Sequence, residues 1–400
     1  MTRNVFILTA ARTPIGSFQG ALPSVTAPEL GAHAIGALDV SDRDPVDEVI
    51  MGNVISAGLK QAPARQAMRL AGLPDSSGAT TVNKVCGSGM KATILAVDLI
   101  RAGSATRVIA GGMESMSNAP YLLQKARGGM ESMSNAPYLL QKARAGMRMG
   151  HSELKDSMFF DGLEDAETSG AMGSFAQTTA DDHQLTREAM DAFAIESVNR
   201  ARKAIATGSL QAEIKPMILG DGSFTDDEQP GRARIEKIPR LRPAFKADGT
   251  ITAANSSSIS DGASALLISD ESALGGAEPL ARCVAHATHS RHPSEFTIAP
   301  AGAIEKLLDR IDWKIEDVDL FEINEAFAMV TMLATQALGL DPERVNIYGG
   351  ACAQGHPIGS TGSRLIVTLA HALKRLNKKR GIAALCIGGG EATAIALERA

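Results

Sequence analysis

The chain has 400 residues, 44% of them apolar, and a formal net charge of −5 at pH 7. This length and apolar content predict a globular protein of two or three domains with a large core. The slightly acidic charge provides no basic face for nucleic acid or for an anionic membrane, although it leaves room for a local basic pocket that binds a phosphorylated ligand.

The cysteines and the first residues indicate where the protein works. Cys86, Cys283, Cys352 and Cys386 lie far apart and form no CxxC pair, so neither a zinc site nor a disulfide framework is suggested. Residues 1–11 are too short a run for a signal peptide, and no window approaches the length of a membrane span. We therefore expect a cytoplasmic protein in a reducing compartment.

Strand and helix patterns alternate from the N-terminus. The expected strands cover residues 5–10, 46–54 and 107–110, with a turn at 12–16 after the first. The expected helices cover residues 28–38 and 62–71, and a third runs from near Met90 to a stop at Gly103. This alternation favours an α/β layer architecture.

Cys86 stands at the junction of a strand-like run and the third helix. It ends an apolar, β-branched segment and precedes Gly87-Ser88-Gly89, where the helical pattern begins. The backbone N–H groups and dipole of a helix N-terminus lower the pKa of a thiol, which makes Cys86 a candidate nucleophile. A small buried cysteine in a tight turn would give the same local pattern.

The composition changes between residues 113 and 250. This region is rich in methionine, glycine and charge and lacks a succession of buried strands, so we interpret it as an insertion that covers a cleft. Residues 186–207 form an amphipathic helix pattern, on which we expect Glu188, Asp191 and Arg200 to face solvent.

A tandem duplication begins the insertion. The sequence GGMESMSNAPYLLQKAR occurs at residues 111–127 and again, without change, at 128–144. Identity over the whole repeat indicates a recent duplication or an error in assembling the sequence. Only one copy can continue the strand that starts near Val108, so we expect the other to bulge outward as added loop or helix.

The C-terminal part repeats the order of elements seen around Cys86. Expected strands cover residues 263–268, 279–287, 318–323 and 382–387, and expected helices cover 304–310, a segment that starts at 324–327, and one after Gly355-His356-Pro357. The last helix leads into a strand that ends in glycines, as the Cys86 helix does. Two halves built alike would place the Cys86 and His356 loops around one cleft.

Three histidines, His286, His289 and His292, raise the question of a metal site. A strand would point positions 286 and 289 to opposite faces, so we expect solvated loop histidines and no metal site.

Four polar groups lie at strand ends or in a glycine-flanked loop of this cleft: Cys86, Asn324, His356 and Cys386. Active sites of α/β folds gather where strands end and helices begin, so their coincidence favours catalysis over structural roles for each one separately.

Four segments carry a strong resemblance to the thiolase family, most of all to its acetyl-CoA acetyltransferase branch. They are VNKVCGSGMKA, NEAFA, GGACAQGHPIGSTGSR and ALCIGGGEA, which contain Cys86, Asn324, His356 and Cys386 in the family's order. The resemblance implies the thiolase fold, with two similar βαβαβαββ halves stacked in five layers and an inserted lid domain. We assign residues 1–117 and 250–278 to the N-terminal half, 118–249 to the lid and 279–400 to the C-terminal half.

The resemblance also implies a role for each of these residues. Cys86 would be the nucleophile that forms an acyl-thioester, and His356 the base that activates it and an oxyanion donor. Cys386 would be the general acid/base. Asn324 would hold an oxyanion water, and Gly388 would contribute its backbone N–H.

Coenzyme A thioesters would be substrates, with no permanently bound cofactor and no metal. The matching contact positions are Ser257, Ala253, Phe327 and Arg232. Partners would be small-molecule acyl-CoA substrates and further copies of the chain, in a homodimer or homotetramer. The chain departs from the family at Gly170-Ala171-Met172-Gly173, where YHMG is usual, and at Gln354, where leucine is usual.

The activity implied is the reversible Claisen condensation of two acetyl-CoA molecules to acetoacetyl-CoA and CoA, through an acetyl-cysteine intermediate in a ping-pong reaction. Two alternatives remain: a degradative 3-ketoacyl-CoA thiolase of broader chain length, and a non-catalytic acyl-CoA-binding relative. The presence of both Cys86 and Cys386 argues against the second.

Overall fold

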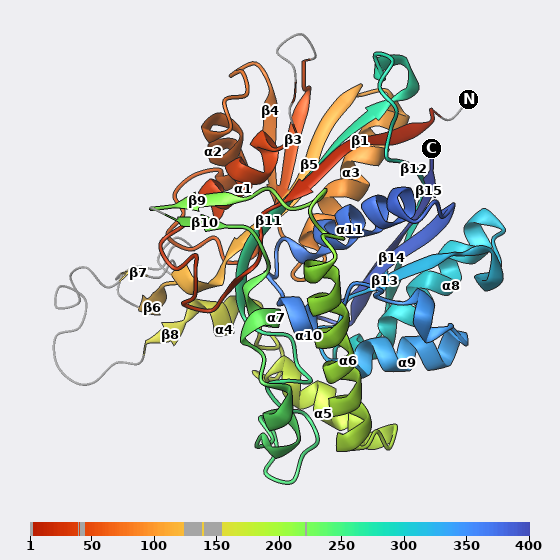
Figure 1. Ribbon diagram of the computed structural model, residues 1–400. Coiled ribbons are helices and arrows are strands. Elements are labelled where there is room, and N and C mark those ends of the chain that lie inside the picture. The colour runs from red at the N-terminus through yellow and green to blue at the C-terminus, as the bar shows by residue number, and fades with distance from the viewer. Residues whose placement is uncertain (1–2, 39, 41–44, 124–137, 140–153, 221) are drawn as a thin grey trace.

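A ten-stranded mixed sheet organises the molecule (Figure 1). The computed structural model describes residues 3–400 except 39, 41–44, 124–137, 140–153 and 221. The strands follow the order β13-β14-β15-β12-β1-β11-β5-β3-β4, and β2 pairs with β11. Their bounds are β1 Val5–Arg12, β2 Gly16–Ser17, β3 Glu48–Gly52, β4 Gly78–Val82, β5 Arg107–Ser115, β11 Ser260–Asp270, β12 Ala281–Ser290, β13 Leu320–Ile323, β14 Arg380–Ile387 and β15 Glu391–Arg399.

The two ends of this sheet have the same topology. In the N-terminal half β4, β3 and β5 are parallel, and β11 runs antiparallel between β5 and β1. In the C-terminal half β13 and β14 are parallel, and β15 runs antiparallel between β14 and β12. Only two residue pairs, Phe6 with Arg282 and Ile7 with Ala281, join β1 to β12. This repeat confirms the expectation of two similar halves.

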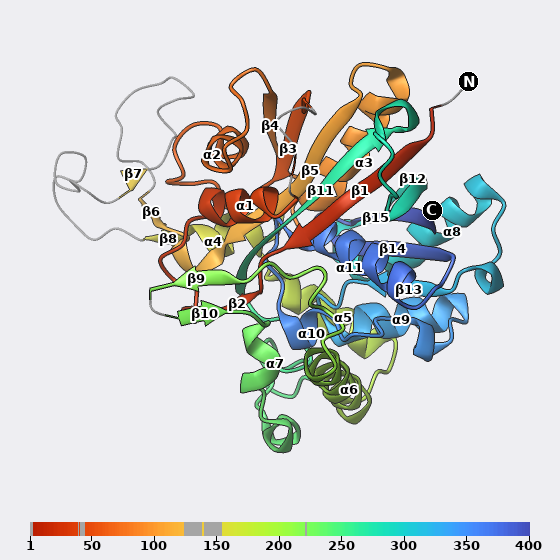
Figure 2. The same ribbon diagram turned by 45° about the horizontal axis from the view of Figure 1, so that its top comes forward.

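Helices form three layers around the two half-sheets (Figure 2). Helices α3 (Ser88–Ala102) and α11 (Thr361–Arg375) pack against each other between the halves. Helices α1 (Ala27–Gly36) and α2 (Pro63–Leu70) cover the outer side of the N-terminal half, and α8 (Ala299–Ile311), followed by α9 (Ala328–Leu338), covers that of the C-terminal half. Separate apolar clusters fill the central and the two outer interfaces, so the five layers implied by the resemblance are present.

The segment between β5 and β11 contributes β6, β7 and β8 at the left of Figure 1 and α5 and α6 at its bottom. Its elements are β6 Tyr121–Leu123, β7 Tyr138–Leu139, β8 Lys155–Asp156, α4 Ser157–Gly162, α5 Met172–Asp182, α6 Arg187–Ala206, β9 Met217–Leu219, β10 Gly222–Phe224 and α7 Glu228–Arg232. A further short helix, α10 (Ala351–Gln354), precedes the His356 loop. None of the helices in the described part of the chain is long and apolar enough to cross a membrane.

Helix α6 confirms the expected amphipathic helix, and Thr186 caps it by accepting a hydrogen bond from the N–H of Ala189. The expectation that Asp191 faces solvent is wrong. Its carboxylate is buried, and it accepts hydrogen bonds from Arg187 on the preceding turn and from the side chain of Asn255.

Two strands extend further than the sequence patterns indicated. Strand β1 continues to Arg12, into the expected turn, because pairing with β11 reaches Ser264. Strand β12 continues to Ser290, so His286 and His289 lie in a strand that pairs with β15 and not in a loop.

The first copy of the duplication continues the sheet. Strand β5 runs from Arg107 into Gly111–Ser115 of that copy, and β6 also belongs to it. The short β7, from the second copy, pairs antiparallel with β6. The remainder of the second copy, where we expected a bulge, lies outside the described residues apart from β7.

Candidate active site

A cavity of about 610 Å³ brings together residues from both halves and from the inserted segment. Cys86, His356 and Gly388 line it. The four positions matched to coenzyme A contacts also line it: Ser257, Ala253, Phe327 and Arg232. Asn324 and Cys386 are fully buried outside its lining. The two are joined through the backbone, since the N–H of Asn324 donates to the carbonyl of Ala384 (3.0 Å) on the strand that carries Cys386.

A left-handed turn at Val85 (φ 48°) presents Cys86 to the cavity. Ser88 stabilises this turn, because its hydroxyl donates to the carbonyl of Val85 (2.6 Å) and accepts from the N–H of Lys84 (2.8 Å). A non-glycine residue in this backbone region is uncommon and marks a position that the surrounding structure holds in place.

The resting thiol of Cys86 is protonated. Burial raises its pKa to about 11, although backbone N–H groups of Gly388 and of Cys86 itself favour the thiolate. The expectation that the helix start lowers the pKa of Cys86 is therefore wrong, because removing the sulfur from water outweighs those N–H groups. The same two N–H groups converge where an oxyanion on a cysteine-bound acyl group would lie.

His356 is held in the tautomer that a base requires. Thr361 donates its hydroxyl proton to the carbonyl of Pro357 (3.0 Å), so its oxygen accepts from Nδ1–H of His356 (2.6 Å). Nε2 is then the unprotonated nitrogen, and it is buried with no hydrogen-bond partner in the described structure. Burial, and next the charge of Arg364, lower the pKa of His356 to about 3, so the ring is neutral at pH 7.

Cys386 and Asn324 are the two buried residues of the site that do not line the cavity. Burial, and next the proximity of Cys86, raise the pKa of Cys386 well above its ordinary value. The side chain of Asn324 is buried, and neither its Oδ1 nor its Nδ2 has a partner in the described part of the chain. Such an amide is suited to hold a small polar group in the cleft.

Aromatic residues shape the part of the cavity beside Phe327. The rings of Phe245 and Phe296 lie edge-on to Phe327, with centroids 6.3 and 6.5 Å away. Ser257 is fixed next to it, since its N–H donates to the carbonyl of Ala326 (3.0 Å). Arg232 is 58% exposed and pairs with Glu228 (2.9 Å), so it lies at the rim.

The segment that departs from the family pattern lines the same cavity. Ala171, Met172 and Gly173 all contribute to its wall. Phe245 packs so closely on Gly173 that a Cβ there would lie 2.1 Å from the ring. The Met172 sulfur approaches Gly388 from the same side, 3.3 Å from where a Cβ would stand. Met172 therefore limits the space beside Gly388.

Sequence reasoning missed Thr361 and Phe245. A signal existed for Thr361, because a hydroxyl five residues after a histidine, on the first turn of the next helix, can reach back to the ring. Phe245 had none, because it comes from an irregular segment far from every motif.

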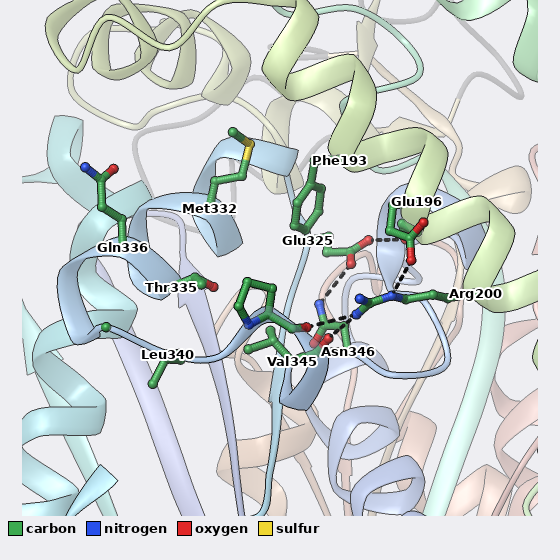
Figure 3. Close-up of a pocket in the computed structure, with 13 residues that line it drawn as sticks. Phe193, Glu196, Arg200, Glu325, Met332, Thr335, Gln336, Leu340, Val345 and Asn346 are labelled. Carbon is green, nitrogen blue, oxygen red and sulfur yellow. Dashed lines mark hydrogen bonds and ion pairs between the residues drawn. The ribbon is translucent and has the colours of Figure 1, made fainter. Parts of the chain in front are cut away.

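A second cavity, of about 540 Å³, lies between α6 and α9, and none of the residues predicted to be catalytic or to contact coenzyme A lines it (Figure 3). Glu325, the neighbour of Asn324, lies on its wall. Its carboxylate accepts hydrogen bonds from Ser197 Oγ (2.7 Å), Asn346 Nδ2 (2.9 Å) and the N–H of Cys352 (3.1 Å). These bonds tie the inserted helix α6 to the asparagine and histidine segments.

The three histidines form no common site. His286 bonds to Asp98 (3.0 Å) and His292 to Ser294 (2.8 Å), whereas the ring of His289 packs on Gly302. Among the described residues no group of His, Cys, Asp and Glu side chains is arranged to hold a metal ion.

The chain is similar to known proteins over nearly its whole length. Residues 5–127 and 126–272 match the family description "Thiolase, N-terminal domain", and residues 277–399 match "Thiolase, C-terminal domain". The two ranges that match the N-terminal domain meet at residues 126–127, inside the duplication.

Curated relatives include an acetyl-CoA acetyltransferase of Schizosaccharomyces pombe, 46% identical over 99% of this chain and 98% of its own length. Another is the acetyl-CoA acetyltransferase of Escherichia coli, 43% identical over 99% of each chain. A thiolase from Ascaris suum, solved in complex with coenzyme A, superposes with a TM-score of 0.89 at 40% identity and covers all of both chains. Human mitochondrial 3-ketoacyl-CoA thiolase, also solved with CoA, gives a TM-score of 0.91 at 34% identity over 100% of this chain and 98% of that one.

Proposed function

The chain belongs to the thiolase family, and from this premise we propose that it catalyses the reversible condensation of two acetyl-CoA molecules to acetoacetyl-CoA and CoA. One observation carries the proposal. Cys86, a correctly oriented His356 and the N–H of Gly388 meet in one cavity, with Cys386 close to Cys86. Curated relatives that are 42–46% identical and named acetyl-CoA acetyltransferase support acetyl-CoA as the acyl donor.

In the first half-reaction His356 Nε2 takes the proton of Cys86, and the thiolate attacks the carbonyl carbon of acetyl-CoA. The N–H groups of Cys86 and Gly388 stabilise the oxyanion of the tetrahedral intermediate. When that intermediate collapses, the CoA thiolate leaves and takes the proton of Cys386. Because burial raises its pKa, the Cys386 thiol enters the cycle protonated. The products are CoA, an acetyl-thioester on Cys86, a protonated His356 and a Cys386 thiolate.

In the second half-reaction the Cys386 thiolate removes an α-proton from a second acetyl-CoA. The enolate oxygen accepts from Nε2–H of His356 and from a water held by Asn324. The enolate carbon attacks the acetyl group on Cys86, acetoacetyl-CoA forms, and the expelled Cys86 thiolate recovers its proton from His356. Both thiols and the neutral imidazole are then restored, and the reverse sequence cleaves acetoacetyl-CoA.

Coenzyme A would lie along the part of the cavity lined by Ser257, Ala253 and Phe327, with Arg232 at the rim near the nucleotide end. The coenzyme enters as a thioester substrate, in keeping with the CoA complexes of the two solved relatives. Met172 and Phe245 narrow the space around the acyl carbon, which supports a short-chain substrate.

We also propose the domain division 1–117 with 250–278, 118–249, and 279–400, a cytoplasmic location and a homo-oligomeric state. The four cysteines are free thiols, as in a reducing compartment.

Strand β4 ends the sheet, and none of its five residues is buried. An open edge of this kind can pair with another copy of the chain, and the mass in solution by light scattering tests this.

Two variants and one substrate comparison test the function. Cys86→Ser should abolish transfer of labelled acetyl to the protein, and Cys386→Ser should slow exchange of the α-proton by about 10²–10⁴-fold. Cys283→Ser, a buried cysteine away from the cavity, is the matched control. Acetylation that persists in Cys86→Ser would refute the assignment of Cys86 as the nucleophile.

The substrate comparison uses the unmodified chain. A rate with a long-chain 3-ketoacyl-CoA far above that with acetoacetyl-CoA would favour the degradative alternative.

A further inference from the structure

We propose that Glu114, in the first copy of the duplicated segment, is a positioning residue that sets the His356 loop against the Cys86 loop. This inference rests on the proposed function, because it assigns the residue that holds the proposed base near the proposed nucleophile. Glu114 lies near the end of β5, in the N-terminal half, and its side chain is fully buried.

The Glu114 carboxylate accepts four hydrogen bonds, from two parts of the chain. Three come from residues just after β3: Oε1 accepts from Asn53 Nδ2 (2.8 Å) and the N–H of Ile55 (3.2 Å), and Oε2 accepts from the N–H of Val54 (3.0 Å). The fourth comes from Gly359, whose N–H donates to Oε2 at 3.0 Å. Gly359 lies three residues after His356, so this one carboxylate bridges the N-terminal half and the loop of the proposed base.

The backbone of this loop packs closely against β5 and α3. A Cβ on Gly359 would lie 2.6 Å from Glu114 Oε2, and a Cβ on Gly112 would lie 2.1 Å from the carbonyl oxygen of Gly359. A Cβ on Gly89, in the first turn of α3, would lie 3.0 Å from the same oxygen. The loop therefore rests directly on β5 and on the helix that follows Cys86.

One of the two residues between His356 and Gly359 belongs to the apolar cluster against which Cys86 packs. Ile358 lines the active-site cavity and packs in one apolar cluster with Val54 and Ile55, against which Cys86 also packs. A shift of Gly359 would consequently move both His356 and the wall of the Cys86 pocket. Misplacement by about 1 Å of groups that react can lower a rate by about a hundredfold.

Glu114 has an internal counterpart, because GGMESMS also occurs in the second copy, where the same position is Glu131. The structure assigns the bridge to the first copy, since Glu114 makes the bonds to residues 53–55 and 359. The duplication thus supplies a matched control within the chain, with the same residue in the same local sequence.

The experiment compares Glu114→Gln with Glu131→Gln in the full chain. Glutamine keeps the shape but replaces one carboxylate oxygen by an NH₂ group, so two of the four bonds are lost, and the two donors that lose their acceptor face the new NH₂ group. We expect Glu114→Gln to lower kcat by about a hundredfold with the KM for acetyl-CoA nearly unchanged. We expect the same variant to alter the rate and the pH profile of Cys86 alkylation by iodoacetamide, read by peptide mapping. Glu131→Gln should match the unmodified chain in every measurement.

Three results would overturn the proposal. They are an unchanged kcat in Glu114→Gln, a loss of thermal stability with an unchanged Cys86 alkylation profile, and a loss of activity in Glu131→Gln instead. If Glu114→Gln does not fold, Glu114→Asp, which keeps the charge but shortens the reach, carries the same comparison. Alkylation needs no turnover, so an unmodified chain without activity would refute the proposed function while the alkylation comparison still tests the positioning role.

Discussion

The reactive residues are stored in their neutral forms. Burial that raises the pKa of Cys86 to about 11 and lowers that of His356 to about 3 disfavours a resting thiolate–imidazolium pair. In the proposed reaction the proton would therefore move when substrate is bound, and an oxyanion would then meet the N–H groups of Cys86 and Gly388. A protonated resting thiol is also less exposed to oxidation and alkylation.

This charge state predicts how Cys86 reacts with iodoacetamide in the absence of substrate. Only the thiolate reacts, so below a pKa of about 11 the reactive fraction rises with pH. We expect the alkylation rate of Cys86 to increase about tenfold per pH unit between pH 7 and 10. His356 stays neutral over that range and adds no inflection. A plateau reached by pH 8 would show instead that the resting enzyme holds a thiolate.

At the scale of elements, a buried charge cluster joins the inserted segment to the two halves. Arg12, at the end of β1, binds Glu213 (2.6 Å) and Asp227 (2.7 Å), both from the inserted segment. Thr368 on α11 donates to the same oxygen of Glu213 (3.0 Å). The insertion that covers the cavity is therefore fastened to a strand and to a helix of the central layer.

Removing the guanidinium of Arg12 should destabilise the protein strongly, because the buried carboxylates of Glu213 and Asp227 then lose their cation. We expect Arg12→Met to lower the free energy of unfolding, measured by urea titration, by about 3–5 kcal/mol. The matched control is Arg3→Ala, which removes a pair with Asp270 in which Arg3 is 45% exposed and should change the same quantity by about 0–1 kcal/mol. Equal effects of the two substitutions would mean that the buried cluster adds nothing specific.

At the scale of the whole molecule, the first copy of the duplication lies beside the candidate active site, because Glu114 accepts a hydrogen bond from the N–H of Gly359. The first copy provides residues 111–115 of β5, which include Glu114, and the curated relatives align with almost the full chain around it. Of the second copy the structure describes Tyr138–Leu139 (β7), which pairs with β6 of the first copy (Figure 1).

Deleting residues 128–144 tests this arrangement. We expect the shortened chain to keep kcat and KM for acetyl-CoA within about twofold, because the residues that hold Cys86 and His356 come from elsewhere. The oligomer mass in solution, measured alongside, shows whether the second copy affects assembly. A loss of activity with an intact oligomer would place residues 128–144 in the active site.

The sequence by itself determined the alternation of strands and helices and the identity of the chemical groups. Apolar periodicity and glycine stops are local properties, so the cores of β1, β3, β14, α3 and α6 could be predicted within a few residues. Motifs also singled out Cys86, Asn324, His356 and Cys386, because reactive residue types at strand ends are visible in one dimension.

The tertiary structure decided the properties that depend on what surrounds a group. Burial reversed the expected pKa shift of Cys86 and made Asp191 an internal carboxylate, and pairing with neighbouring strands extended β1 and β12 beyond their apolar patterns. It also disclosed Thr361 and Glu114, whose roles consist of hydrogen bonds to particular atoms of the His356 loop. Desolvation and the donors that compensate it come from residues distant in sequence, and only the folded chain brings them together.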